Sequence, residues 1–156
     1  MTLEFKYYVE TSVWGMIPKG QPRVMRRASL QFFSRVPKTR LFISRVVLDE
    51  VEDSPESVRG PILRAIDSIK PSVLEVTIQA SSLSRAYISS KVLPAKKKED
   101  ALHVAIATTE ELDLLVSWNY RHMANQRKTE LYSGVNLAQG YWKTPRITTP
   151  LGALDG

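Results

Sequence analysis

Short apolar runs alternate with longer helical stretches along this chain, and that alternation limits the folds it can form. Strand-like runs lie at 5–9, 41–43, 73–76, 114–117 and 146–148. Helical patterns fill the intervals, among them 80–92, 100–111 and 120–132. Parallel strands need crossovers of this length, whereas antiparallel hairpins do not. The pattern therefore predicts an α/β sandwich with a mainly parallel sheet.

Capping residues and prolines suggest where several helices begin and end. Thr11 and Ser12 are expected to cap a short helix, and Ser44 to cap a helix that begins at Arg45. A further helix is expected between Pro22 and Pro37. Its predicted apolar positions are Val24, Ala28, Leu30, Phe32 and Phe33.

Composition narrows the class of protein. We find no repeat or long linker, so residues 1–156 are expected to form a single domain. The chain has no cysteine, which excludes disulfides, thiolate metal sites and cysteine nucleophiles. No apolar run is long enough to span a membrane and the first residues do not resemble a signal peptide, so a cytoplasmic location is expected.

The charge balance favours an anionic partner. Lys and Arg number 22 and Asp and Glu 16, a formal charge of +6. Basic groups attract nucleic-acid phosphates. The charge alone does not distinguish RNA from single-stranded DNA.

Four oxygen-bearing side chains are expected at one edge of the sheet. Glu10 follows the first strand and Asn119 the fourth, while Glu50 and Asp100 lie near the beginning of helices. Ligands of open parallel sheets bind outside the carboxyl ends of the strands. Carboxylates held close together repel one another unless a cation compensates them, and a hard cation such as Mg²⁺ or Mn²⁺ fits oxygen ligands. The sequence thus favours a metal site here.

At these residues the chain resembles the PIN-domain family. YYVETSVW is similar to its opening strand, SRVVLDEVE to its second acidic element and KKKEDALHVAIAT to its third. LLVSWNYRHMAN is similar to the fourth strand and following turn in one branch, and YWKTPRITTP to the closing strand. The likeness runs from about residue 6 to 150.

This resemblance implies a three-layer α/β/α sandwich with about five strands and an endoribonuclease that uses Mg²⁺ or Mn²⁺. Glu10, Glu50 and Asp100 would be catalytic, metal-binding carboxylates, and Asn119 would occupy the fourth acidic position. Ser12 would orient an acid or water. Many bacterial relatives are toxins of toxin and antitoxin pairs, so an antitoxin partner and a homodimer are also implied.

Two positions depart from the common family pattern. Glu10 stands where many members have Asp and keeps the charge. Asn119 also stands where many members have Asp, but its amide carries no charge. With three formal negatives instead of four, weaker metal binding and one ion rather than two are expected. The alternative function is a noncatalytic RNA-binding or protein-interaction domain with a weakened metal site.

Several neighbouring residues compete for roles. Asp49 is an alternative to Glu50, because adjacent helix positions point about 100° apart. Asp113 precedes its strand and should lie at the opposite edge. His103 is either a hydrogen-bonded core residue or a partner of Asp100, and His122 is either a substrate contact or structural.

Basic residues flank the expected site. Lys96, Lys97 and Lys98 precede Asp100, and Arg121 follows the fourth strand, so these four are the candidate RNA-binding residues. The alternative for each is a solvated charge. The chain lacks both a Gly-x-Ser-x-Gly turn and a glycine-rich phosphate loop, which argues against serine hydrolase and P-loop chemistry.

Overall fold

Five parallel strands form one sheet at the centre of the computed structural model, which describes residues 4–123 and 125–155 and leaves out the side chains of residues 121 and 122. Their order is β3-β2-β1-β4-β5. The strands are β1 Tyr7–Val9, β2 Leu41–Ser44, β3 Ser72–Leu74, β4 Leu114–Val116 and β5 Arg146–Thr148. Tyr8 lies beside Phe42 of β2 and Leu115 of β4. The expected α/β fold with a parallel sheet is confirmed.

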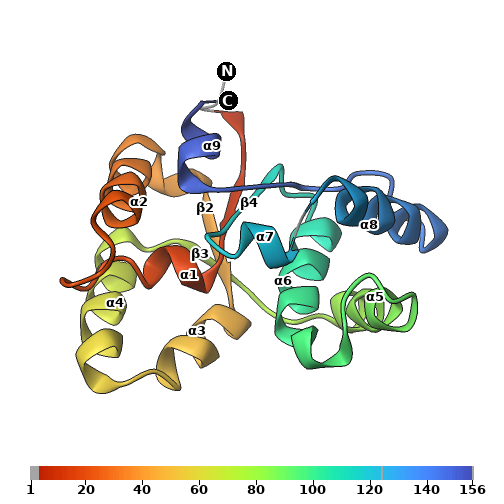
Figure 1. Cartoon of the computed structure of the whole chain (residues 1–156), viewed down its shortest axis with the longest axis horizontal. Coiled ribbons are helices and arrows are strands. Elements are labelled where there is room, and N and C mark those ends of the chain that lie inside the picture. The colour runs from red at the N-terminus through yellow and green to blue at the C-terminus, as the bar shows by residue number, and fades with distance from the viewer. Residues whose placement is uncertain (1–3, 124, 156) are drawn as a thin grey trace.

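Helices cover both faces of this sheet (Figure 1). One side carries α1 Thr11–Trp14, α2 Arg23–Arg35 and α4 Glu56–Ile69, while α3 Arg45–Glu52 lies at the lower end of the strands in this view. The other carries α5 Ile78–Ser89, α6 Lys98–Thr109, α7 Tyr120–Met123 and α8 Gln126–Ala138. The last helix, α9 Pro150–Leu154, returns to pack on α2. Two single 3₁₀ turns, Lys38–Arg40 and Ala95–Lys97, precede β2 and α6.

The core lies around the two central strands. Every residue of β1 and β4 is buried, as expected of continuous apolar strands covered on both faces. Helix α6 buries most of its circumference, including Val104, Ile106 and the polar His103. The sequence correctly predicts α6 as a central helix.

The strand order reverses between β1 and β4. From β1 the chain proceeds through β2 to β3 at one edge, and from β4 it proceeds to β5 at the other. Two neighbouring connections therefore leave the sheet in opposite directions at this point, which opens a crevice outside the carboxyl ends of β1 and β4. Glu10 and Asn119 follow these two strands.

The structure corrects several expected elements. Thr11 is the first helical residue of α1, whose N-cap position is Glu10, so Thr11 and Ser12 do not cap it. Val24 is 72% exposed and Leu30 37% exposed, so both lie outside the core. The single helix expected over 120–132 is divided into α7 and α8, and Asn125 caps α8 by accepting from the Lys128 N–H.

Other boundaries agree with expectation. Ser44 caps α3 through a hydrogen bond from the Val46 N–H, and β5 spans the expected residues. Helix α9, with Thr149 as its cap, was not predicted. Within the described residues, no helix is both long and apolar enough to cross a bilayer.

Candidate active site

Glu10 is a buried carboxylate at the carboxyl end of β1, only 2% exposed. Ser12 Oγ donates to its Oε1 at 2.6 Å, and Ser117 Oγ donates to the same oxygen at 2.5 Å. Ser12 Oγ in turn accepts the Trp118 N–H at 2.8 Å. These bonds tie the residues after β1 to those after β4, and they leave Oε2 of Glu10 available to a cation.

Glu50 reaches the same place from α3. Its Oε1 accepts a hydrogen bond from Thr11 Oγ1 at 2.5 Å and another from His103 Nε2 at 2.8 Å. Burial alone would raise the pKa of Glu50, but the bonds from His103 and Thr11 lower it below the usual value. The neighbouring Asp49 is exposed, so Glu50 is the α3 carboxylate that faces the site.

His103 links the acidic cluster to the core. Its Nδ1 shares a 2.6 Å hydrogen bond with the Tyr8 hydroxyl, which shares a 2.7 Å bond with Ser44 Oγ. The ring is fully buried, which by itself would lower its pKa, yet the bond to Glu50 and the charge of Glu10 raise that pKa above the usual value. The His103 ring therefore orients Glu50 from a fixed position.

Asp100 lies in the first turn of α6 on the wall of a pocket of about 240 Å³. Burial raises the pKa of this carboxyl, and the negative charge of Glu10 raises it further. Part of that effect is offset by His103 and Lys97. A cation beside Asp100 would relieve the repulsion that destabilises its charged form.

Two adjoining pockets bring the predicted residues together. Glu50, Asp100 and Asn119 line the first, and Glu10, Ser12, Glu50 and Asn119 line the second, of about 310 Å³. Since Glu50 and Asn119 belong to both, the polar residues from β1, α3, α6 and the turn after β4 share one region. The structure thus places Glu10, Ser12, Glu50, Asp100 and Asn119 side by side, and their roles remain proposals.

The predicted basic residues are divided. Lys96 and Lys97 line the pocket of Asp100, whereas the exposed Lys98, at the start of α6, is absent from its lining. Arg121 and His122 have side chains outside the described part of the structure, so nothing is said of their contacts. Asp113 lies at the opposite sheet edge, as predicted, where it pairs with Lys143 at 2.8 Å.

The donor set fits a divalent cation. Ligand atoms of Glu10, Glu50 and His103 all lie within 4.8 Å of one another. Carboxylate oxygens suit Mg²⁺ and Mn²⁺. The compact group differs from the predicted ligand set in including His103, with Asp100 on the adjoining wall.

Sequence reasoning found one of the hydroxyl groups that hold the carboxylates, Ser12, and missed two others. Thr11 and Ser117 were not singled out as site residues, although Thr11 directly follows Glu10 and Ser117 ends a predicted strand at the site edge. Their position at the site edge could have identified them from the sequence. Nothing in the sequence indicated a site role for Tyr8, because an aromatic residue inside a strand normally indicates core packing alone.

Comparisons with known proteins show the fold. No family model matches the chain, and no curated protein matches it. Among solved structures, the toxin VapC20 of Mycobacterium tuberculosis, described as cleaving the sarcin-ricin loop, shares a TM-score of 0.60 and 14% identity. The match covers 90% of this chain and 100% of that one.

A second solved structure supports the same assignment. It is VapBC2 from Rickettsia felis bound to a DNA fragment from its promoter, with a TM-score of 0.51 and 18% identity over 74% of this chain and 88% of that chain. At such low identity the likeness concerns the fold. The PIN-like fold that the sequence motifs predict is therefore confirmed.

Proposed function

We propose that this protein is a metal-dependent endoribonuclease that hydrolyses RNA phosphodiester bonds. The observation that carries the proposal is the meeting of Glu10, Glu50 and Asp100 at the point where the strand order reverses. Parallel sheets bind ligands in that crevice. A lined pocket with converging acids and perturbed pKa values is the expected form of a catalytic site.

Glu10, Glu50 and Asp100 would hold the cation, directly or through water, while His103 stays hydrogen-bonded to Glu50. A bound Mg²⁺ or Mn²⁺ supplies Lewis-acid chemistry, since it lowers the pKa of water and neutralises charge on a phosphate. Three carboxylates and one amide at Asn119 favour a single ion rather than two.

The protein's own residues then position the reactants. Ser12 and Ser117 fix Glu10, while His103 and Thr11 fix Glu50. Such supports keep carboxylates in place while substrate binds. Asn119 presents an amide toward both pockets, and Lys96 and Lys97 bind phosphate beside the acids.

A toxin role with a partner protein belongs to the same proposal. VapC20 is described as a toxin that cleaves the sarcin-ricin loop, and the second similar structure is VapBC2. From this likeness we propose an antitoxin partner, and we propose a homodimer from the family resemblance of the sequence alone. Coexpression with the product of a neighbouring short gene, followed by light scattering of the purified complex, tests them.

Asp100→Asn tests the catalytic proposal. With Mn²⁺ and a fluorescently labelled RNA that contains both a stem-loop and a single strand, we expect the cleavage rate to fall at least about 100-fold, since the variant loses a ligand charge. Asp67→Asn removes the same charge from an exposed position on α4 and should cleave at the wild-type rate. A chelator should abolish RNA cleavage by the wild type and by Asp67→Asn.

Two results would contradict the proposal. If Asp100→Asn cleaves as fast as the wild type, the acidic cluster is not the catalytic site. If the wild type binds the RNA and leaves it intact with either Mg²⁺ or Mn²⁺, the noncatalytic alternative, in which Asn119 weakens the metal site, is favoured.

A further inference from the structure

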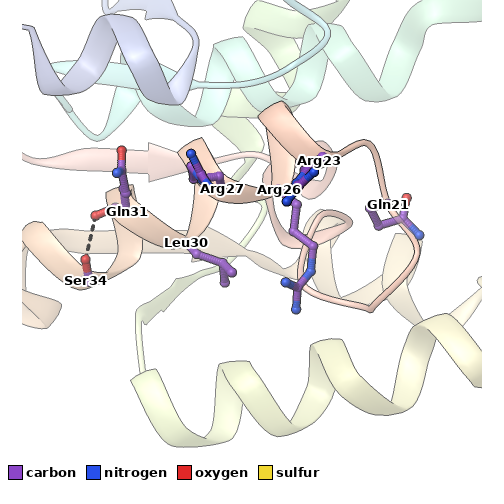
Figure 2. Close-up of a pocket in the computed structure, with 7 residues that line it drawn as sticks. All are labelled: Gln21, Arg23, Arg26, Arg27, Leu30, Gln31 and Ser34. Atoms are coloured by element: carbon purple, nitrogen blue, oxygen red, sulfur yellow. Dashed lines mark hydrogen bonds between the residues drawn. The ribbon is translucent and has the colours of Figure 1, made fainter.

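A further pocket, of about 580 Å³, lies along most of the length of α2 (Figure 2). It is a surface separate from the acidic site, since the two share none of their lining residues. The lining residues are Gln21, Arg23, Arg26, Arg27, Leu30, Gln31 and Ser34. We call this surface the arginine pocket.

The arginine pocket concentrates positive charge. Arg23, Arg26 and Arg27 stand at helix positions i, i+3 and i+4, so their side chains leave neighbouring parts of one helix face. No carboxylate lines the pocket, and none of the three arginines forms an ion pair with another described residue. Three mutually repelling cations without a counter-charge indicate a surface suited to an anion.

Two further observations indicate unused hydrogen-bond donors here. Arg26 Nη2 donates to the Ile17 carbonyl at 3.1 Å, but its Nε is shielded from water and has no acceptor. Pro22 at the N-cap of α2 makes no side-chain cap, and the first turn contains no acidic residue. An anion would interact favourably with the positive end of the helix and would accept hydrogen bonds from the guanidinium groups.

The start of the arginine pocket follows the segment that leaves the acidic site. The chain leaves β1 through Glu10 and α1, and residues 15–22 lead directly to the start of α2. The bond from Arg26 to Ile17 joins the pocket to this connection. Helices α2 and α6 flank the sheet on opposite sides (Figure 1), and the arginine pocket belongs to α2 whereas Lys96 and Lys97 directly precede α6.

We propose that the arginine pocket binds the phosphodiester backbone of an RNA strand on the α2 side of the cleaved bond, an inference that rests on the proposed ribonuclease function. Carboxylates repel phosphates, so the phosphates next to the cleaved bond must be held by a neighbouring basic surface. Guanidinium groups fit phosphate oxygens in pairs. Gln21 and Gln31 add amide groups for bases or sugars, and Leu30 adds an apolar surface on which a base can rest.

The test measures RNA binding without cleavage. Arg23 and Arg27 are both exposed, so the double variant Arg23→Gln/Arg27→Gln should fold, as a thermal melt will show. We titrate a labelled single-stranded RNA in the presence of a chelator and follow fluorescence anisotropy at several salt concentrations. The variant should bind about tenfold more weakly, and its plot of log K against log salt should be shallower by about 1.4, at about 0.7 per lost phosphate contact.

A matched control removes two charges elsewhere. Lys38→Gln/Arg85→Gln changes exposed residues before β2 and on α5, and should shift the affinity for RNA less than about twofold. Equal affinity and equal salt dependence for the wild type and the Arg23→Gln/Arg27→Gln variant would overturn the proposal. A second result would also overturn it: the variant loses binding of a labelled peptide rich in Asp and Glu but still binds RNA normally. The pocket would then serve an acidic protein segment.

The RNA-binding measurement does not depend on cleavage, because it is made without metal. If Asp100→Asn abolishes cleavage while the arginine variant binds RNA normally, the arginine pocket inference fails and the proposed function stands. If the arginine variant loses RNA binding while the wild type cleaves no RNA, the arginine pocket remains an RNA-binding surface, and its position beside a cleaved bond fails together with the proposed function.

Discussion

Glu10 shows how single residues make an acidic site compatible with a folded core. A buried carboxylate needs hydrogen bonds or a counter-charge, and Glu10 receives both kinds of support. Ser12 and Ser117 donate to one of its oxygens, and His103 Nε2 lies 4.0 Å from the other. The side chain is therefore held in place with one oxygen directed to the proposed cation.

Asn119→Asp should tighten Mn²⁺ binding. The change restores a fourth carboxylate on the wall that both site pockets share, and we expect about tenfold higher affinity, or about 1.4 kcal/mol, in calorimetry. Asn125→Asp is the control, because Asp caps a helix as well as Asn and adds the same charge at the start of α8. Unchanged affinity in Asn119→Asp would remove this residue from the metal site.

Asp113, which lies outside the acidic site, should make the stability of the fold depend on pH. Burial alone would raise its pKa, but the bonds from Lys143 and the Lys6 N–H lower it. Its contribution is thus present above the unfolded pKa of roughly 3.9 and is lost as pH falls through the lower folded-state pKa. Asp113→Asn should cost about 1 kcal/mol of unfolding free energy near neutral pH in urea titrations.

The difference between Asp113→Asn and the wild type should shrink below that folded-state pKa, because the wild-type carboxyl is then protonated. Asp67→Asn, at an exposed position on α4, should differ little from the wild type at any pH. A constant difference for Asp113→Asn across the acid range would show that Asp113 acts through something other than its charge.

At the scale of elements, helix α3 sets the direction of Glu50. Ser44 ends β2 and caps α3, and its hydroxyl also contacts Tyr8, which contacts His103. His103 then donates to Glu50, which is itself on α3. The start of α3 and the carboxylate on it are therefore joined by a closed set of hydrogen bonds through two strands and α6.

Ser44→Ala should lower both stability and metal affinity. Loss of the cap costs about 1 kcal/mol, and the released Tyr8 and His103 no longer hold Glu50 in one position. Thr77→Ala removes the corresponding cap of α5, where Thr77 accepts the Ala80 N–H. Urea unfolding should show similar losses in both, whereas calorimetry with Mn²⁺ should show weaker binding only in Ser44→Ala. Equal Mn²⁺ affinity would mean that the network through Tyr8 does not support the site.

At the scale of the whole molecule, the site belongs to the sheet rather than to any one segment. Its residues come from the ends of β1 and β4, from α3 and from α6. A ligand that connects these elements must bind the native state and not the unfolded chain. Folding stability and metal binding are consequently linked.

Mn²⁺ should raise the thermal stability of the whole chain. At about 100 times its Kd, an ion that binds only the native state adds about 2.7 kcal/mol, or roughly 5 to 10 °C in Tm for a chain of this size. Asp100→Asn should lose most of the shift and Asp67→Asn should keep it, as measured by scanning calorimetry. An equal shift in Asp100→Asn would place the bound ion away from the acidic cluster.

Particular residues show how far sequence reasoning reached. Aromatic and β-branched residues identified β1, and a continuous apolar run identified β4. The positions of Glu10 after β1 and of Asn119 after β4 could be interpreted because parallel strands end at a common edge. The boundary between α7 and α8 was missed, since it depends on Asn125 acting as a cap rather than on periodicity. Val24 and Leu30 were assigned to the core, although this face of α2 is left to solvent.

The sequence by itself determined the parallel α/β architecture, because hydrophobic periodicity is a local property, and its motifs, through the family resemblance, indicated Glu50 rather than Asp49 among the carboxylates. Only the tertiary structure decided which atoms meet. The link from His103 to Glu50 spans 53 residues, and the bond from Ser117 to Glu10 spans 107. Such contacts depend on how helices and strands pack against one another, which no local pattern encodes.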